Sequence, residues 1–396
     1  MYDHAYTILG IVVAVFLIAK ALRLSTELSM LASAIAAAAY HGAVWSGEVP
    51  IRHLVEGTFT YFDVCLIFIS ATFFMALVKE SGGVAFIVRR IVGAFRTQRV
   101  ICLLLLTLVM LIPGALTGSG ATSVLTVGAL VGSVLTAMGV DDTRKTAAIF
   151  MTAAMSAAAP PINLWAMMAA AGANMPYIGF NGPLAVLSIS GALFSMFWLA
   201  GRGGAPVDEN VMERLPQPPE RMNWLRVLTP FVIFAALLLA GRVRPFDFPI
   251  LGLPMIFMIS ALVVWLLSPV KLAVWDILTQ TVRNLLPLGG IMVVVGALIQ
   301  VLALSGARGV ISLHVVILPL EVLFATLFII LPVSEGILQY AVAPLLGVPL
   351  IMLFNMKGMD VIVALSAMSV LWPIGDCLPP TAVVGRASVM ELDYKG

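Results

Sequence analysis

Two stretches decide the fold of this chain: residues 139–163, GVDDTRKTAAIFMTAAMSAAAPPIN, and residues 358–382, GMDVIVALSAMSVLWPIGDCLPPTA. They lie 219 residues apart, and both have a Gly-x-Asp start, a mainly apolar run and a Pro-Pro pair near the end. At the same offset, Pro113 matches Pro332. Chance matching of two apolar segments rarely brings all of these features into register. We therefore predict an internal repeat.

The composition indicates a membrane protein. Of the 396 residues, 61% are hydrophobic and 11% are charged, and the mean hydropathy is +1.08. A soluble domain has about 45–50% apolar and about 25% charged residues. The apolar stretches have the length of spanning helices, about 18–22 residues, and not the pattern of barrel strands. We expect an all-α polytopic protein of the lipid bilayer, in the bacterial inner membrane.

The same composition excludes several function classes. The net charge is +2 without a basic block, which argues against nucleic acid as a partner. The three cysteines lack CxxC spacing, and the four histidines form no HExxH motif. Because no nucleophile and base or metal-ligand set has a suitable spacing, we expect neither an enzyme nor a bound cofactor.

The order of apolar and polar segments predicts the organisation of the chain. Lys20 and Arg23 lie two crossings before the basic linker at 89–99, which predicts an N-terminus outside the cytoplasm. Two regions interrupted by Pro and Gly, at 113–139 and 332–358, predict re-entrant hairpins, and helix breaks are expected at 160–161 and 379–380. The predicted segments are N-terminal scaffold-like spans at 1–99, a first transport repeat at 100–200, a polar connector at 201–226, second scaffold-like spans at 227–304 and a second transport repeat at 305–396.

Interrupted helices in two matching halves are typical of secondary transporters, whose sites lie near the middle of the membrane. Whether the repeats are inverted or parallel depends on the number of crossings between them, and inverted repeats are the form we expect here. A Pro-Pro pair ends one helix and begins the next, so that N–H groups and a positive dipole end suit a carboxylate. The substrate-binding candidates are Pro160, Pro161, Asn163, Pro379, Pro380, Thr381 and Arg386. Helix capping is the alternative for Asn163, and interfacial anchoring is the alternative for Arg386.

The first hairpin tip, TGSGATS at 117–123, offers hydroxyl and carbonyl oxygens that suit Na⁺. Close helix packing is the alternative reason for its small residues. Glu335 and Asp376 lie at apparent membrane depth, where acids act as cation ligands or proton carriers unless they cap a water-exposed turn. The Na⁺ candidates are Gly118, Ser119, Gly120, Thr122, Ser123, Ser334, Glu335 and Asp376. Asp141 and Asp360 are expected to begin helices.

These motifs, together with SGG at 81–83, APPIN at 159–163 and LPPTAVVG at 378–385, resemble the large membrane subunit of tripartite ATP-independent periplasmic (TRAP) transporters. The resemblance implies an elevator-type carrier in the ion-transporter superfamily that takes up organic acids with Na⁺. It also implies a small membrane subunit and a periplasmic substrate-binding protein as partners. The site residues that it implies are Ser119, Thr122, Pro160, Asn163, Ser334, Pro379 and Thr381.

Two positions depart from the family's pattern: Leu378 precedes the second Pro-Pro pair, and Glu335 lies in the second hairpin. We predict a secondary transporter that imports a small organic anion of the carboxylate or dicarboxylate class with Na⁺. The alternative within transport is a proton-coupled, stand-alone carrier that uses Glu335 and Asp376. The alternative of another class is a membrane scaffold subunit that does not transport.

Overall fold

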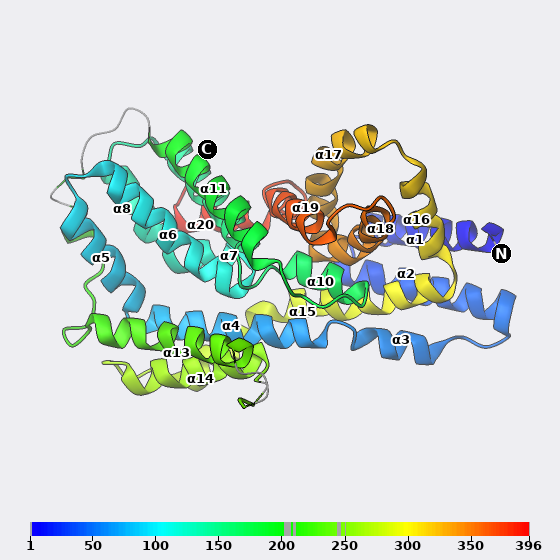
Figure 1. The fold of residues 1–396 in the computed structure, drawn as a ribbon, viewed down its shortest axis with the longest axis horizontal. Coiled ribbons are helices and arrows are strands. Elements are labelled where there is room, and N and C mark those ends of the chain that lie inside the picture. Colours follow the sequence, from blue (N-terminus) through cyan, green and yellow to red (C-terminus); the bar gives the residue numbers. More distant parts are fainter. Residues whose placement is uncertain (1, 202–206, 209–210, 244–246, 250, 396) are drawn as a thin grey trace. The chain divides into compact units, whose positions relative to one another are not determined.

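The computed structural model describes residues 2–201, 207–208, 211–243, 247–249 and 251–395, and these residues form helices without a strand (Figure 1). The first half contains α1 (Tyr2–Ala21), α2 (Thr26–His41), η1 (Gly42–Ser46), α3 (Ile51–Thr58), α4 (Phe62–Glu80), α5 (Gly83–Phe95), α6 (Arg99–Thr117), α7 (Gly120–Ser123), η2 (Val124–Gly128), α8 (Ala129–Ala137), α9 (Asp142–Ala158), α10 (Leu164–Gly172) and α11 (Asn181–Ala200). The second half contains α12 (Val211–Arg214), α13 (Trp224–Val243), α14 (Leu253–Leu267), α15 (Val274–Leu304), α16 (Ala307–Ile317), α17 (Leu320–Leu338), η3 (Gln339–Ala341), α18 (Val342–Met356), α19 (Val361–Gly375) and α20 (Val383–Glu391).

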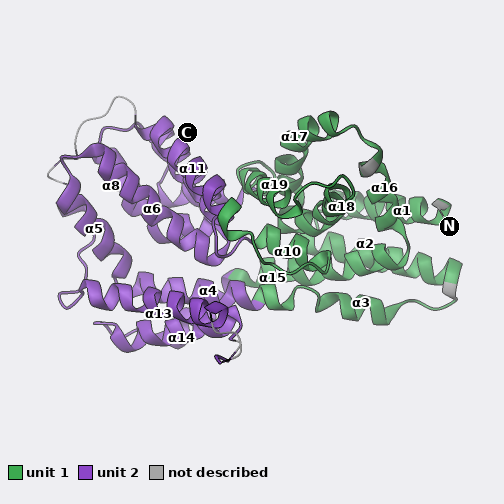
Figure 2. Cartoon of the chain, in the orientation of Figure 1, with its two compact units in different colours: residues 1–65, 164–183, 285–381 green, residues 66–163, 184–284, 382–396 purple. Residues whose placement is uncertain are grey.

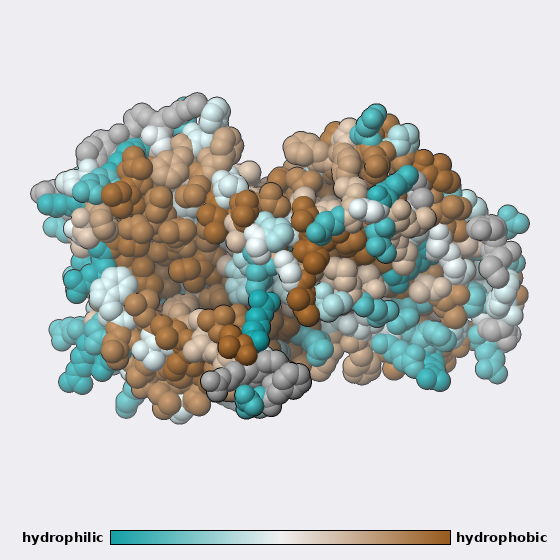
Figure 3. Space-filling view, viewed as in Figure 1, coloured by the Kyte–Doolittle hydropathy of each residue, from teal (hydrophilic) through white to brown (hydrophobic). Residues whose placement is uncertain are grey.

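Within the described ranges, nine helical segments are long and apolar enough to cross a membrane. Large apolar side chains also lie on the surface, and on α11 Val186 is 70% exposed and Phe194 is 66% exposed. Hydrophobic side chains cover much of the visible face of unit 2 (Figures 2 and 3), an arrangement that water would oppose and lipid favours. The prediction of an all-α, multi-pass membrane protein is confirmed.

The chain folds into two compact units that each draw on both halves of the sequence (Figure 2). Unit 1 contains residues 1–65, 164–183 and 285–381, and unit 2 contains residues 66–163, 184–284 and 382–396. The chain leaves unit 2 directly after Asn163 and leaves unit 1 directly after Thr381, in both cases just beyond a Pro-Pro pair. The segments predicted from the sequence describe the order of the chain, whereas the compact units combine parts of several segments.

The two halves exchange helices between these units. In unit 1, α10 of the first half packs against α18 and α19 of the second half, and α1 packs against α16. In unit 2, α20 of the second half packs against α7, η2 and α9 of the first half. Also in unit 2, the ring of Phe86 on α5 meets Trp224 on α13 edge to face, with ring centroids 5.2 Å apart. Each unit is therefore completed by helices that the other half of the sequence supplies.

The two Gly-x-Asp motifs begin helices, as predicted. Gly139 and Gly358 have φ values of 74° and 69°, a left-handed conformation that favours glycine. Two residues later, the Asp141 carboxylate accepts a hydrogen bond from the N–H of Arg144 at 3.0 Å. The Asp360 carboxylate accepts from the N–H groups of Ile362 and Val363. Both acids are N-caps that satisfy free donors of the first turn.

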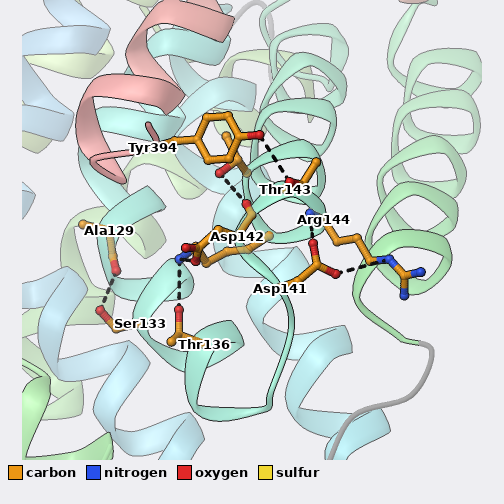
Figure 4. A network of polar contacts seen from close by, with 10 residues as sticks. Ala129, Ser133, Thr136, Asp141, Asp142, Thr143, Arg144 and Tyr394 are labelled. Carbon is orange, nitrogen blue, oxygen red and sulfur yellow. Dashed lines mark hydrogen bonds and ion pairs between the residues drawn. The ribbon is translucent and has the colours of Figure 1, made fainter. Parts of the chain in front are cut away.

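Polar contacts around the first of these caps hold the link between α8 and α9 (Figure 4). The Lys145 ammonium donates to the Asp142 carboxylate at 2.6 Å and to the Thr136 hydroxyl at 3.1 Å, and so joins α9 to α8. The hydroxyls of Thr143 and Tyr394 lie 3.2 Å apart in the same unit. This cluster fixes the turn between α8 and α9.

The prolines at the predicted starts of the two hairpins do not interrupt their helices. Pro113 lies inside α6 and Pro332 lies inside α17, and both helices continue past these residues. The chain turns at 118–119, within the predicted first tip at 117–123, and at 339–341 in the second hairpin, after the predicted 332–336. Proline is tolerated inside a membrane helix where neighbouring helices satisfy the freed backbone groups. The arms that meet at the first tip, 99–117 and 120–137, are long enough to span a membrane.

A glycine in α6 permits close packing against α9. A Cβ added to Gly114 would lie 2.6 Å from the Cβ of Ser156 and 2.8 Å from its carbonyl carbon. We expect Gly114→Ala to lower the stability of the protein by about 1–3 kcal/mol, because the helices must move apart. Thermal unfolding of the purified protein in detergent measures this effect.

Gly10→Ala in α1 is the matched control, because a Cβ there would meet no atom within 4 Å. It should leave stability unchanged or raise it by up to about 1 kcal/mol, since alanine favours helix. Equal unfolding temperatures for the two variants would contradict the close packing of α6 and α9.

Candidate functional site

The first hairpin tip joins α6 to α7 in unit 2, and most of it is buried. The Thr117 hydroxyl donates to the Pro113 carbonyl at 2.7 Å, and the Ser123 hydroxyl donates to the Met110 carbonyl. The Ser119 hydroxyl accepts from the N–H of Thr122 at 3.4 Å. The structure thus brings Gly118, Ser119, Gly120, Thr122 and Ser123 together. Three of the hydroxyl groups in this tip already hold the backbone of the turn.

The first Pro-Pro pair follows α9 in the same unit and is tied to α6. The N–H of Ile162 donates to the Ala115 carbonyl at 3.1 Å. The side-chain amide of Asn163 is fully buried and donates to the Ala158 carbonyl at 3.1 Å. The N–H of Ile162 is therefore paired with α6, and the half-helix after the first Pro-Pro pair, α10, begins at Leu164.

The second Pro-Pro pair, in unit 1, has a similar tie to the helix before its hairpin tip. Both the N–H and the hydroxyl of Thr381 donate to the Gly336 carbonyl, at 3.3 Å and 2.8 Å. The N–H of Thr381 is therefore paired as well, and the half-helix after the second Pro-Pro pair, α20, begins at Val383. Pro379 and Pro380 are exposed, as is Arg386 on α20 in unit 2.

Glu335 and Asp376 form a buried carboxyl pair in unit 1. Glu335 lies in the last turn of α17 and is 0% exposed, and Asp376 follows α19 and is 1% exposed. Their helices approach closely, since a Cβ on Gly375 would lie 2.6 Å from the Cβ of Glu335. The two carboxyls are near enough to repel each other. Ser334 lies beside Glu335 in the chain, but its hydroxyl donates to the Leu331 carbonyl at 2.9 Å.

Few neighbouring groups balance the polarity and charge of this carboxyl pair. Both oxygens of Glu335 and one oxygen of Asp376 are buried without a hydrogen-bond partner. Among the described residues, no Lys, Arg or His lies within ion-pairing distance of either carboxyl. Burial of an unpaired carboxylate is costly, so a proton or a bound cation must balance the charge.

The sequence analysis missed an aromatic residue beside Glu335. Trp165 on α10 neighbours Glu335, and its ring stacks on Tyr340 with centroids 4.7 Å apart. The indole nitrogen of Trp372 is buried without a hydrogen-bond partner, whereas the indole N–H of Trp165 lies near the Glu335 carboxyl. One signal was available, because Trp372 precedes Asp376 by four residues and residues at that spacing share a helix face.

A separate cavity of about 850 Å³ lies in unit 1. It is lined by parts of α1, η1 and α3 and by the end of α15, and none of the predicted site residues lines it. Its polar lining includes His4, His41 and His53. The sequence analysis assigned no role to these histidines.

One solved structure settles the class of fold. The YdaH transporter of Alcanivorax borkumensis is similar over 87% of this chain and 82% of that chain, with a TM-score of 0.57 and 16% identity. The chain has the fold of a membrane transporter. No protein-family profile matches it, and no curated protein does. At this level of identity the transporter comparison concerns the fold alone, and the resemblance to the TRAP large subunit stays a prediction.

The tie between Thr381 and Gly336 can be tested by stability. Thr381→Val removes the hydroxyl donor and should cost about 0.5–1.5 kcal/mol, whereas Thr381→Ser should keep most of the wild-type stability. Thermal unfolding in detergent distinguishes the two variants.

Thr279→Val is the control, because the exposed Thr279 hydroxyl donates only to Trp275 in its own helix. It should leave the unfolding temperature close to that of the wild type. A loss in the control as large as that in Thr381→Val would contradict the tie.

Proposed function

We propose that this protein is a secondary active transporter of a bacterial inner membrane that imports a small organic anion together with a cation. The Glu335–Asp376 pair carries this proposal, because two neighbouring buried carboxyls lack any cationic partner in the described chain. Intramembrane acids are costly and typically serve as ion ligands or proton carriers. The similarity to a transporter fold supports the same class.

Comparison of the two hairpin regions explains why we assign the cation to unit 1. At the 219-residue offset, Glu335 and Asp376 correspond to Leu116 and Ala157, which are buried apolar residues. The hydroxyl residues of the first tip correspond to apolar residues in the second: Ser119 to Leu338, Thr122 to Ala341 and Ser123 to Val342. The two carboxyls thus have no counterpart in the first half, and Ser119, Thr122 and Ser123 have no hydroxyl counterpart in the second.

Na⁺ and H⁺ remain the two candidates for the coupling cation. Two carboxylates with nearby carbonyl oxygens suit Na⁺, a hard cation that oxygen atoms bind. Two neighbouring buried carboxyls also suit a shared proton, since like charges oppose ionisation of both groups. A shared proton corresponds to the proton-coupled, stand-alone carrier.

Matching helix bounds support the repeat that we propose. The helices α10 and α20 begin and end 219 residues apart, and so do the helical segments 120–137 and 339–356. The chain also crosses between units after Cys65 and after Asn284, at the same offset. Inverted repeats with interrupted helices are common in transporters, and we propose an elevator-type movement for this chain. A small membrane subunit and a periplasmic binding protein are proposed partners.

Thermal unfolding tests the cation site without knowledge of the substrate. The unfolding temperature of the purified protein is measured in NaCl, KCl and choline chloride of equal ionic strength, at one acidic and one alkaline pH. A bound cation should stabilise the folded protein by about 2.7 kcal/mol at 100 times its Kd. We expect a saturable response to Na⁺ or to pH that Glu335→Gln and Asp376→Asn both abolish.

Glu321→Gln is the matched control, because Glu321 is an exposed acid on the same helix as Glu335. It should keep the full cation response. A response that survives in Glu335→Gln but disappears in Ser119→Ala would move the cation to the first tip. A protein that responds to neither Na⁺ nor pH would favour the scaffold subunit over the transporter.

A further inference from the structure

Tyr61 and Arg308 meet at the C-terminal end of α10 in unit 1. The Arg308 guanidinium donates through Nη2 to the Gly172 carbonyl at 2.9 Å. Tyr61 is 1% exposed, and its hydroxyl lies 2.8 Å from the point that a Cβ on Gly172 would occupy. The guanidinium and the phenol are close enough to interact electrostatically. Three distant parts of the sequence therefore converge on one helix end.

Both side chains carry a donor without an acceptor. The hydroxyl of Tyr61 and the Nε of Arg308 are buried and have no hydrogen-bond partner. Within the described ranges, no carboxylate lies within ion-pairing distance of Arg308. A half-buried guanidinium whose Nε has no acceptor is costly, and so is a buried hydroxyl that donates to nothing. A negatively charged hydrogen-bond acceptor would satisfy both of these donors.

We infer that Arg308 and Tyr61 bind a carboxylate group, the anionic end of the substrate. This inference rests on the proposed function and adds residues to it that the sequence analysis did not identify. A guanidinium donates to carboxylate oxygens in a planar fork. Nε–H and one N–H of Nη2 lie on the same side of the guanidinium and can form this fork, while the other N–H of Nη2 donates to Gly172. The phenolic hydroxyl of Tyr61 supplies a further donor.

The helix α10 connects this site to the carboxyl pair. Trp165, in its first turn, neighbours Glu335, and Gly172, its last residue, holds Arg308. Seven residues of helix rise by about 10 Å. Unit 1 therefore places an unbalanced positive group and an unbalanced negative pair at opposite ends of one short helix. A substrate carboxylate and a coupling cation, bound together, would neutralise both.

Thermal unfolding with carboxylate probes tests the site in the full-length protein. The probes are acetate, succinate and citrate, with succinamide as an uncharged probe and sulfate as an anion without a carboxylate, all at constant Na⁺ and pH. We expect a saturable rise in unfolding temperature with at least one carboxylate, and none with succinamide. Sulfate should stabilise less than that carboxylate, and an equal shift would show a general anion effect and overturn the assignment.

The variants identify the residues. Arg308→Gln should abolish the rise, and Arg308→Lys and Tyr61→Phe should each weaken the apparent affinity about tenfold, because each removes donors to the carboxylate. Arg283→Gln, a change of an exposed arginine on α15, should behave like the wild type. If Arg308→Gln does not fold, the other two variants decide the question. Wild-type affinity in both of them would show that Arg308 only caps α10 and would overturn the site.

The cation response separates this inference from the proposed function. Glu335→Gln should lose the response to Na⁺ or pH and keep stabilisation by the carboxylate. Arg308→Gln should show the reverse. A wild-type protein that responds to the cation but to none of the carboxylates would overturn the Arg308 site and leave the transporter proposal intact. A protein that responds to carboxylates but not to Na⁺ or pH would overturn the cation site of the proposed function and leave the Arg308 site intact.

Discussion

The backbone groups released where a helix is interrupted must find partners, because apolar surroundings offer none. Each Pro-Pro pair stops a helix, and the residue after it is tied to the helix before the hairpin tip. Ile162 donates to Ala115 in unit 2, and Thr381 donates to Gly336 in unit 1. These bonds make each hairpin and its broken helix one packed body. The chain then leaves that unit, so α10 and α20 are built into the opposite units.

With the backbone satisfied in this way, the side chains of the two tips differ in what they can do. At the first tip, the hydroxyls of Thr117 and Ser123 donate to carbonyls, and their chemistry is largely used by the fold. At the second tip, Glu335 and Asp376 lack such partners. The two tips thus differ in polarity: the hydroxyls of the first are bonded to carbonyls, and three of the carboxyl oxygens of the second are buried without partners.

The exchanged helix α10 gives unit 1 its charge arrangement. It contributes Trp165 beside the acids at one end and the Gly172 carbonyl beside Arg308 at the other. A buried carboxyl pair and a half-buried guanidinium weaken a protein when no opposite charge lies beside them. Their retention in one unit is readily understood if ligands bring the missing charges, and less readily if the unit only supports other proteins.

The sequence by itself determined the features that depend on local chemistry. Apolar run lengths predicted the membrane, Gly139 and Asp141 with their counterparts predicted helix starts, and the Pro-Pro pairs predicted helix ends. These signals act within a few residues, through φ angles, caps and missing N–H groups. It could also single out Glu335 and Asp376, since each is an acid in an apolar run.

Only the tertiary structure decided which distant segments meet. It placed Pro113 inside a helix, because neighbouring helices tolerate a proline that local rules treat as a break. It joined Glu335 to Asp376 and Tyr61 to Arg308, and it put α10 in the unit of the second hairpin. No local pattern encodes such pairings. They depend on the path of the chain between two units and on the close approach that residues such as Gly375 and Gly172 allow.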